Sequence, residues 1–309
     1  MKTAVIFPGQ GAQFVGMGRD IWERYPEARL TFEEANEILG EDLARICFEG
    51  PEDELRQTRN TQPAIFVHSI AVLRLLQLPI EGAEWRAAGH SLGEYTAYVA
   101  AGAFSFADGL RLVRRRGELM HQAGQAQPGT MAAVLGLPGE RLEEVLRGVS
   151  GVVRADNFNS PGQVVISGEI AAVGRAMEAC KEAGAKRVVP LEVGGAFHSP
   201  LMESAALGLA AWLEQTPVRA PRCAVLANAS AEPVVEPAAI RRSLERQLLS
   251  PVRWEQITRS LLDWGAERFL ELGPGKVLSG LVRSVEREAQ TVAVGDAAQV
   301  AAWLGAQSS

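Results

Sequence analysis

Hydrophobic positions along the chain follow two rhythms, short apolar runs and longer stretches with helical spacing. The segments Thr3–Phe7 and Trp85–Ala88 are short runs of the first kind and predict buried strands. Between them, Thr61–Leu76 carries apolar residues on nearly all of its faces, which predicts a buried helix. Strands that alternate with helices in this way are typical of a mostly parallel, doubly wound sheet.

The alternation continues through most of the chain. The other elements that we expect in this part are helices at Met17–Arg24, Leu30–Leu39, Leu92–Gly102, Phe106–Gln122, Pro200–Glu214, Ala238–Leu249 and Val252–Trp264, strands at Ala224–Ala227 and Arg268–Leu272, and a helix from Lys276. The tail Ser308–Ser309 is expected to fray.

The middle of the chain has a different order of elements. The glutamine- and glycine-rich segment Ala123–Gly129 predicts a linker. From there to Leu191 the pattern is strand–helix–strand–strand–helix–strand, the ferredoxin-like order, with Asn157–Gly162 as the turn between the middle strands. We therefore expect a discontinuous catalytic domain at residues 1–125 and 193–309, and a small ferredoxin-like subdomain at residues 126–192.

Composition narrows the possible functions. With 309 residues, 47% of them hydrophobic, the chain can bury a large core. Its net charge of −6 argues against a general nucleic-acid or membrane-surface binder. No apolar run is long enough to span a bilayer, and the N-terminus does not resemble a signal peptide. Three widely spaced cysteines fit a reducing cytoplasm, and they indicate neither a disulfide framework nor a zinc site.

The strongest candidate for chemistry is the pentapeptide Gly89–Gly93, which has the pattern GxSxG. It joins a predicted strand to a predicted helix, and such a turn lifts the hydroxyl of Ser91 above the end of a sheet. The helix that follows points its N-terminus at that hydroxyl. The alternative is a glycine-rich connection in which the serine is incidental.

A serine nucleophile needs a base, and the chain has four histidines. His68 lies among apolar residues of a predicted helix, which favours a core position. His90 is inside the pentapeptide, where the turn directs it away from the hydroxyl, and His121 ends a helix. His198 lies on a loop directly before a helix, and elimination therefore pairs it with Ser91.

A carboxylate to orient this histidine is harder to identify. Asp108 and Asp156 lie between Ser91 and His198 in the sequence, as in a hydrolase triad. Asp108 is expected to cap a helix, and Asp156 ends a strand of the inserted subdomain. A dyad whose histidine is oriented by a neutral acceptor is therefore an equally good hypothesis.

Two further polar side chains have open interpretations. Arg116 lies at the edge of the apolar stripe of its helix, so it is either a snorkelling residue or a partly buried clamp for an anion. Gln10 follows the first strand, in a turn that lacks the third glycine of a dinucleotide-binding loop. It is either an ordinary turn residue or an amide donor directed into a site.

Taken together, these segments resemble the malonyl-CoA:acyl carrier protein transacylases, a family also found as the acyltransferase domains of polyketide synthases. The resemblance covers nearly the whole chain and includes the segments Phe7–Gln13, Gln62–Ala64, Gly89–Glu94, Arg116–Gly117, Asn157–Gln163, Gly195–Ser199, Arg246–Leu248 and Glu271–Gly275. It implies a hydrolase-like, mostly parallel α/β sheet flanked by helices, with an inserted ferredoxin-like α+β subdomain. That fold agrees with the one that the periodicity predicts.

The resemblance also implies a set of catalytic roles. Ser91 would be the nucleophile and His198 its base. Gln247 occupies the position whose main-chain carbonyl orients that histidine in place of a carboxylate. Gln10 and the backbone N–H of Leu92 fall at the oxyanion-hole positions of the family.

Substrate recognition follows from the same resemblance. Arg116 matches the arginine that pairs with the malonyl carboxylate, and Gln62, Asn159 and Phe197 fall within the matched segments as further substrate-binding residues. The aliphatic residue after the serine and the segment Ala196–His198 follow the pattern that accompanies preference for malonyl over methylmalonyl groups.

The implied partners are malonyl-CoA and an acyl carrier protein, with no cofactor, no metal, no nucleic acid and no membrane. We expect a cytoplasmic monomer that supplies fatty-acid synthesis. Because carrier proteins of this pathway are acidic and this chain is net negative, docking needs a local basic patch, for which Lys186–Arg187 is a candidate. The alternatives are a thioesterase or esterase of the hydrolase type, a polyketide-pathway acyltransferase, and a non-catalytic scaffold that binds the carrier.

Overall fold

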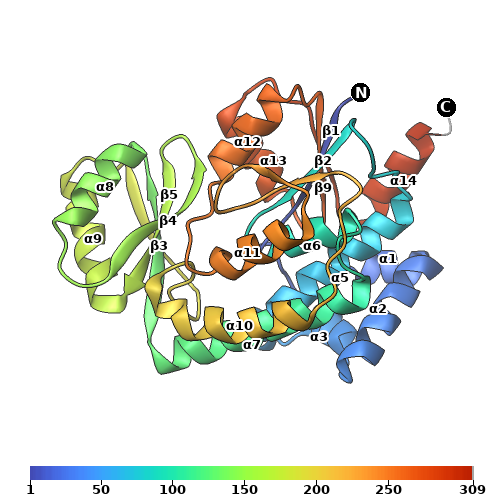
Figure 1. Ribbon diagram of the computed structural model, residues 1–309, viewed down its shortest axis with the longest axis horizontal. Coiled ribbons are helices and arrows are strands. Elements are labelled where there is room, and N and C mark those ends of the chain that lie inside the picture. Colours follow the sequence, from blue (N-terminus) through green and yellow to red (C-terminus); the bar gives the residue numbers. More distant parts are fainter. Residues whose placement is uncertain (308–309) are drawn as a thin grey trace.

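The computed structural model describes residues 1–307, which form two sheets with helices packed around them (Figure 1). The larger sheet has the strand order β10-β9-β1-β2-β7-β8, and every neighbouring pair is parallel except β7 and β8. Its strands are β1 (Thr3–Phe7), β2 (Trp85–Gly89), β7 (Ala224–Leu226), β8 (Pro233–Val234), β9 (Arg268–Leu272) and β10 (Thr291–Val294). The predicted fraying of Ser308–Ser309 concerns residues outside the described part.

Both faces of this sheet are covered, which explains why its central strand β1 is buried throughout and almost entirely apolar. All five residues of β1 are buried. Successive side chains of a strand point to opposite faces, so Val5 and Phe7 pack on one side and Ala4 and Ile6 on the other. The first side is covered by α5 (Thr58–Leu76), α6 (Leu92–Ala100) and α7 (Phe106–Ala126), and the second by α12 (Trp254–Asp263) and α13 (Val277–Val285).

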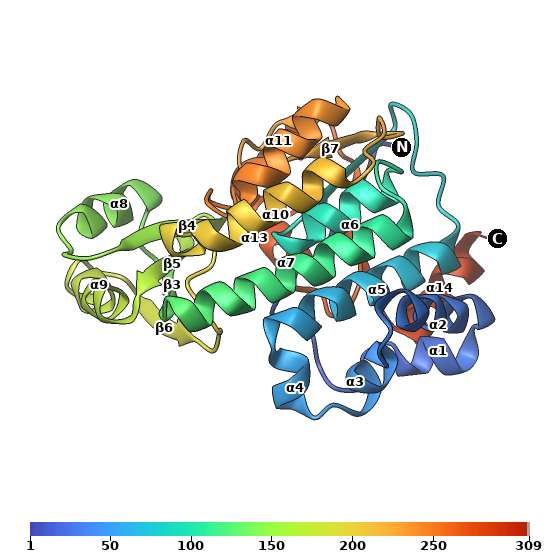
Figure 2. The same cartoon turned by 60° about the horizontal axis from the view of Figure 1, so that its bottom comes forward.

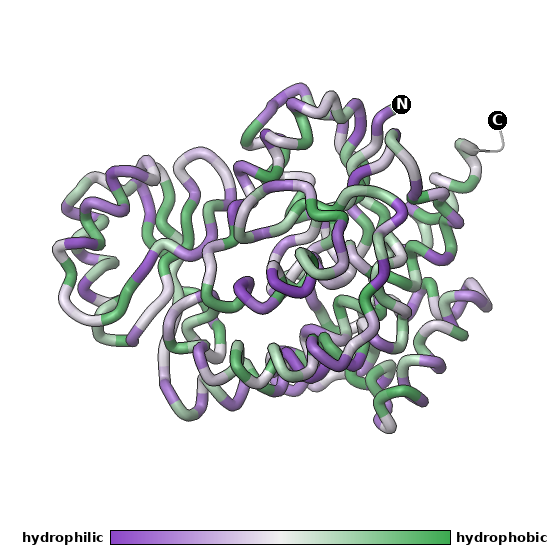
Figure 3. Tube along the Cα trace, viewed as in Figure 1, coloured by the Kyte–Doolittle hydropathy of each residue, from purple (hydrophilic) through white to green (hydrophobic). Residues whose placement is uncertain are grey.

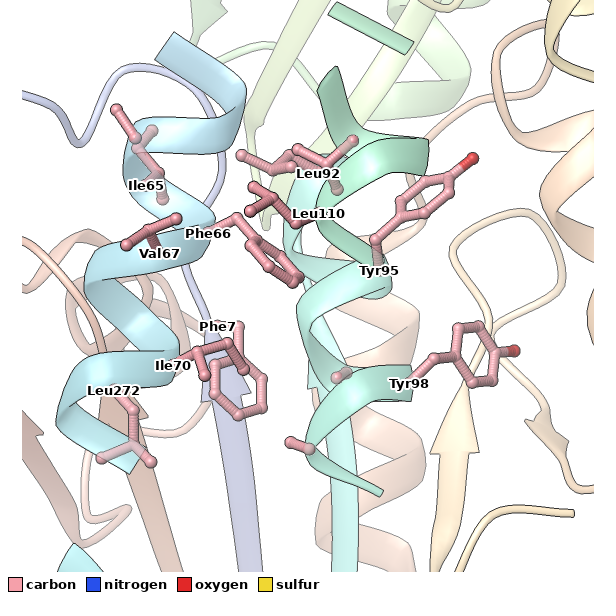
Figure 4. Close-up of a cluster of buried hydrophobic side chains, with 14 of the residues drawn as sticks. Phe7, Ile65, Phe66, Val67, Ile70, Leu92, Tyr95, Tyr98, Leu110 and Leu272 are labelled. Atoms are coloured by element: carbon pink, nitrogen blue, oxygen red, sulfur yellow. The ribbon is translucent and has the colours of Figure 1, made fainter. Parts of the chain in front are cut away.

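Figure 4 shows how tightly the first layer is packed. Side chains of α5 and α6 approach one another beside Phe7 of β1 and Leu272 of β9. Phe66, Leu92 and Leu110 fill the space between these helices and α7. Burial of this kind contributes on the order of 2 kcal/mol for each large side chain, so the layer fixes α6 relative to the sheet.

The smaller sheet is antiparallel and has the strand order β4-β5-β3-β6. Its elements in chain order are β3 (Gly129–Leu135), α8 (Gly139–Arg147), β4 (Val153–Ser160), β5 (Gln163–Glu169), α9 (Ile170–Glu182) and β6 (Arg187–Leu191). The two helices cover one face, where Leu142, Ile166 and Val173 belong to a separate core cluster. Figure 3 shows hydrophilic and hydrophobic residues alternating along both helices, as expected when only one side of a helix is buried.

The remaining helices surround the larger sheet (Figure 2). They are α1 (Arg19–Arg24), α2 (Pro26–Leu39), α3 (Leu43–Glu49), α4 (Glu52–Arg56), α10 (Glu203–Gln215), α11 (Pro237–Gln247) and α14 (Ala297–Gln307), together with the 3-10 turn Pro200–Met202. Within residues 1–307, no helix is both long and apolar enough to cross a membrane.

The predicted fold class is confirmed, since the main sheet is predominantly parallel and flanked by helices. Two local predictions are wrong. The expected linker Ala123–Gly129 is largely helical, because α7 continues to Ala126 with Ala123 and Gly124 buried. The subdomain boundaries proposed for this part of the chain stay a prediction.

The segment Asn157–Gly162 is also mostly strand and not a turn. Strand β4 continues to Ser160, and only Pro161 and Gly162 lie between it and β5. Register shifts in β4 let its polar residues stay paired with β5. In addition, Val252 donates its N–H to the Asp156 carbonyl at 2.8 Å, which joins this strand to the segment before α12.

Candidate active site

The turn between β2 and α6 holds Ser91 in an unusual backbone conformation, with φ 51° and ψ −102°. Such a conformation costs on the order of 1–3 kcal/mol and persists only where the surroundings impose it. Here the N–H of Ser91 donates to Asn228 Oδ1 at 2.7 Å, and the N–H of His90 donates to the Phe7 carbonyl at 3.0 Å. The turn is therefore fastened to two neighbouring strands.

Glycine is required at positions 89 and 93 because neither position has room for a side chain. A Cβ atom at Gly89 would lie 1.9 Å from the carbonyl carbon of Gly93, and a Cβ atom at Gly93 would lie 2.1 Å from the Phe7 oxygen. Both contacts are with backbone atoms, which cannot move without shifting the strand or the helix. The GxSxG pattern therefore reflects the close approach of α6 to the end of the sheet.

Ser91 and His198 are paired in the structure. Ser91 Oγ lies 2.8 Å from His198 Nε2, and His198 Nδ1 lies 2.9 Å from the Gln247 carbonyl oxygen and 3.2 Å from that of Ser250. Carbonyl oxygens only accept, so Nδ1 carries the proton and the lone pair of Nε2 faces the serine hydroxyl. The hydroxyl therefore donates to the histidine, and the orienting acceptor is neutral.

The surroundings of His198 favour its neutral form. Burial, and then the positive charge of Arg116, lower the pKa of His198 to about 3, while the carbonyls of Gln247 and Ser250 oppose that shift. A neutral imidazole is the form that can accept a proton from Ser91. His198 itself has a positive φ of 62°, so its presentation on the loop is imposed by the surrounding contacts.

Arg116 is completely buried, which excludes the snorkelling interpretation. Its Nη1 donates to Gln62 Oε1 at 2.8 Å, and its Nη2 donates to Ser91 Oγ and to Gln247 Oε1, both at 3.0 Å. No carboxylate lies within 4.0 Å of its guanidinium in residues 1–307. A buried cation whose partners are neutral favours the binding of an anion beside Ser91.

Two backbone N–H groups near the serine are available for an oxyanion. Those of Gln10 and Leu92 make no hydrogen bond in the described part of the chain, and both residues line the same pocket as Ser91. The side chain of Gln10 points elsewhere, because its Nε2 donates to Thr58 Oγ1 at 3.4 Å. At this residue, the main-chain group is therefore the free donor.

The pocket in front of Ser91 has an empty volume of about 510 Å³, its mouth included. Its lining residues are Gln10, Gln62, His90, Ser91, Leu92, Arg116, Met120, Met131, Asn157, Leu191, Val193, Phe197 and His198. A second pocket adjoins it, shares Gln10, His90, Asn157 and Leu191, and extends past Asn159 to α13. Together they form a cleft between the two sheets that leads to the serine.

The remaining predicted site residues occupy different positions. Gln62 and Phe197 line the serine pocket, whereas Asn159 lines the adjoining pocket and accepts a hydrogen bond from His90 Nε2 at 2.8 Å. Neither candidate aspartate contacts His198. Asp108 is paired with Ser105 at the start of α7, and Asp156 is buried in the small sheet.

Asn228 and Glu94 hold the turn in place, although the sequence analysis gave neither a role. Asn228 Nδ2 donates to the Gly89 carbonyl at 2.7 Å, and its backbone N–H donates to Glu94 Oε2 at 3.1 Å. Asn228 follows β7, which neighbours β2 in the sheet, and a polar residue at that edge is a signal that could have been used. Glu94 lies in the first turn of α6, where its burial is not visible in the sequence.

Metal binding has no support in the geometry. Among the residues described, no three histidine, cysteine, aspartate or glutamate side chains are grouped so that they could hold a metal ion. The three cysteines are buried and unpaired.

Comparison with known proteins identifies relatives along nearly the whole chain. A family model described as "Acyl transferase domain" matches residues 4–304. The malonyl CoA-acyl carrier protein transacylase of Bacillus subtilis (strain 168) is 47% identical over 298 residues, covering 96% of this chain and 94% of the relative. The Haemophilus influenzae protein of the same name is 43% identical over 300 residues, covering 96% of each chain.

Solved structures give the same result. One is a malonyl-transacylase in complex with a type II polyketide synthase acyl-carrier protein, with a TM-score of 0.95, 41% identity and coverage of 99% of this chain and 100% of that one. An acyl carrier protein S-malonyltransferase from Vibrio cholerae has a TM-score of 0.92, 43% identity and coverage of 98% and 99%.

Proposed function

The chain belongs to the acyl transferase family, and on that premise we propose that it transfers a malonyl group from malonyl-CoA to the phosphopantetheine thiol of an acyl carrier protein. The observation that carries the proposal is the buried guanidinium of Arg116, which has neutral partners and donates to the hydroxyl of Ser91. An acyl group with a free carboxylate fits such a site, because its charge can reach the arginine while its thioester carbonyl reaches the serine.

The first half of the reaction acylates the serine. Ser91 Oγ attacks the thioester carbon as its proton passes to His198 Nε2, at 2.8 Å in the free enzyme. The N–H groups of Gln10 and Leu92 stabilise the oxyanion, each contributing about 3–4 kcal/mol if correctly placed. Collapse of the intermediate breaks the carbon–sulfur bond, and the departing CoA thiolate takes the proton from His198.

The second half repeats these steps in reverse with a different thiol. The phosphopantetheine thiol of the carrier gives its proton to His198 and attacks the malonyl-serine ester. The carbon–oxygen bond to Ser91 breaks, and His198 returns the proton to the serine oxygen. The enzyme is regenerated, and the malonyl thioester leaves on the carrier in a ping-pong cycle.

Arg116 provides the selectivity in this scheme. A guanidinium can pair with a carboxylate through two parallel hydrogen bonds, which an acetyl or fatty acyl group cannot form. Without the carboxylate, the buried cation keeps only its bonds to Gln62, Gln247 and Ser91. The apolar part of the pocket, which includes Phe197, then contacts the methylene carbon of the malonyl group.

The carrier protein approaches through the cleft between the two sheets, so that its phosphopantetheine arm reaches Ser91. We place its docking surface at Lys186 and Arg187, which are exposed at the start of β6, while Leu191 at the other end of that strand lines the cleft. Charge reversal at both positions should raise the KM for the carrier and leave that for malonyl-CoA unchanged. An unchanged carrier KM would remove this surface from the proposal.

Further parts of the proposal concern the cellular setting. Three buried, unpaired cysteines support a cytoplasmic location. In that compartment, the malonyl carrier serves as the extender unit for fatty-acid synthesis.

Intact-protein mass spectrometry tests the function directly. The protein is incubated with equal amounts of malonyl-, methylmalonyl- and acetyl-CoA, with and without carrier protein, and Ser91→Ala serves as the control. We expect a malonyl adduct on Ser91 that persists without carrier and moves to the carrier when it is added. Rapid release of free CoA without any acceptor would instead indicate a thioesterase, and absence of an adduct would indicate a non-catalytic carrier-binding protein.

A further inference from the structure

The side-chain amide of Gln247 links two buried ionisable residues. Its Oε1 accepts from Arg116 Nη2 at 3.0 Å, and its Nε2 donates to Glu94 Oε2 at 2.7 Å. The same Nε2 donates to the Ser91 carbonyl at 2.8 Å. Arg116, Gln247 and Glu94 are at most 1% exposed, so the chain of bonds runs through the interior.

The two charges fix which way this amide faces. A guanidinium can only donate, and a carboxylate or carbonyl oxygen can only accept. If the amide of Gln247 were reversed, its NH₂ group would face the donors of Arg116 and its oxygen would face Glu94 and the Ser91 carbonyl. Each of the three bonds would become a repulsive contact, so the observed orientation is the only satisfied one.

Gln247 also reaches the base through its main chain. Its carbonyl oxygen accepts the Nδ1 proton of His198 at 2.9 Å. One residue therefore orients the base with its backbone and the guanidinium with its side chain. The position of that side chain in turn depends on Glu94, because Glu94 supplies the only side-chain acceptor for its NH₂ group in residues 1–307.

Glu94 is itself firmly placed. It lies in the first turn of α6, three residues after the nucleophile, and its Oε2 also accepts the backbone N–H of Asn228 at 3.1 Å. The side chain of Asn228 holds the serine turn through bonds to the N–H of Ser91 and the carbonyl of Gly89. Glu94 therefore contacts both the support of the nucleophile and the support of the guanidinium.

We propose that Glu94 is a positioning residue that fixes the Gln247 amide, holds the Arg116 guanidinium beside Ser91, and thereby helps to set the preference for acyl groups that carry a carboxylate. The inference depends on the proposed malonyl transfer. An acetyl group has no carboxylate to pair with the arginine, so loss of this support should affect malonyl groups more than acetyl groups. A purely structural role in α6 would affect both to the same degree.

Two variants of Glu94 distinguish the effect of its ionisable carboxyl group from the effect of its acceptor oxygen. Glu94→Gln keeps an oxygen that can accept from Asn228 and Gln247 but removes the charge, whereas Glu94→Ala removes the acceptor altogether. We expect the ratio of malonyl to acetyl transfer to fall by a few-fold in Glu94→Gln and by about tenfold or more in Glu94→Ala. The ratio is measured by competition between the two CoA esters, with the acylated carrier quantified by mass spectrometry.

Gln247→Met provides a second, independent variant. It removes the side-chain amide but keeps the main-chain carbonyl that orients His198. It should therefore lower the ratio of malonyl to acetyl transfer, as Glu94→Ala does. If both residues act through the same link, the double variant should lose no more selectivity than Gln247→Met alone. Additive losses in the double variant would overturn the proposal.

Glu271→Gln is a matched control. Glu271 is another fully buried glutamate, and its carboxylate accepts the backbone N–H groups of Leu278 at 3.0 Å and Ser279 at 2.7 Å, at the start of α13. Its substitution should lower the melting temperature while the malonyl to acetyl ratio stays at the wild-type value. Equal losses of malonyl and acetyl transfer in Glu94→Gln would contradict the proposal even if Glu94→Ala does not fold. Failure of the wild-type protein to form a malonyl adduct would instead refute the proposed function.

Discussion

The two sheets contribute differently to the pocket that they enclose. The parallel sheet and its helices supply the side chains with hydrogen-bonding or acid–base chemistry next to the serine, including Ser91, Arg116 and His198. From the antiparallel sheet come Met131, Asn157 and Leu191, two of which are apolar. The cleft thus has a reactive side and a side that mainly gives it shape.

The buried polar groups show the same contrast. Close to the serine, Arg116, Gln247 and Glu94 form one connected set of hydrogen bonds. In the small sheet, the carboxylate of Asp156 is buried and has no hydrogen-bond partner among the described residues. Substitutions on the two sides should therefore have different consequences.

The largest effect should come from removing the nucleophile on the reactive side. Ser91→Ala should lower malonyl transfer by on the order of 10⁴-fold or more, since removal of a nucleophile leaves only binding and oxyanion stabilisation. Steady-state transfer to the carrier and the absence of an acyl adduct check this. Substantial residual transfer through another residue would show that the reactive side is wrongly assigned.

The next effect concerns the guanidinium on the same side. Arg116→Ala should lower malonyl transfer by about 10²- to 10³-fold and acetyl transfer much less, because only malonyl groups have a carboxylate that pairs with the buried cation. Arg116→Lys should restore little, since an ammonium cannot form the same pair of parallel bonds. Measurements of kcat/KM with both CoA esters test this, and an unchanged ratio would remove Arg116 from substrate recognition.

A substitution on the shaping side should alter binding more than chemistry. Leu191→Ala should raise the KM for malonyl-CoA by up to about tenfold with little change in kcat, because it removes apolar contact from the cleft. Val188→Ala on the same strand is the control, since Val188 packs against the separate core of α8 and α9. A large fall in kcat for Leu191→Ala would show that the small sheet also positions the reacting groups.

The smallest effect is on stability and depends on pH. Burial raises the pKa of Asp156 to about 8, against the opposing charge of Arg154. Its folded-state pKa therefore lies above the unfolded value of about 4, so its contribution to stability is complete below pH 4 and is lost as the pH rises to 8.

Asp156→Asn removes the titrating carboxyl group. The loss of stability between pH 4 and pH 8 should therefore be smaller in this variant. We expect its melting temperature to exceed that of the wild type by roughly 5 °C at pH 8 and by little near pH 4. Thermal unfolding followed by circular dichroism at both pH values measures the difference. The same difference at both pH values would show that Asp156 is not the group that titrates.

Local patterns in the sequence predicted much of the fold. The apolar runs at β1 and β9 and the spacing in α5 are visible in the sequence because these segments are buried by the sheet and its covering layers. The strands β8 and β10 were not predicted because they are very short, and the helix α14 was not predicted because apolar residues are spread around it without a clear stripe. The end of α7 was misplaced because the glycine and glutamine residues there resemble a linker.

The site was predictable to a similar extent. Ser91 and His198 could be paired from the sequence alone, because the GxSxG turn is a local motif and only one histidine stands on a loop before a helix. The absence of a suitable aspartate was also visible, although the family resemblance was needed to suggest Gln247. Arg116 remained ambiguous, since helical spacing places a residue at the edge of a stripe without showing what covers it.

The amino-acid sequence by itself determined the alternation of strands and helices, the close glycine-lined turn and the identity of the serine–histidine pair. Only the tertiary structure decided that Arg116 is completely buried, that Glu94 and Asn228 support the turn, and that the Gln247 side chain joins arginine to glutamate. The physical reason is distance along the chain. Glu94, Arg116, Asn228 and Gln247 come from segments that meet only when the parallel strands align, and the charge and burial of each are set by the others.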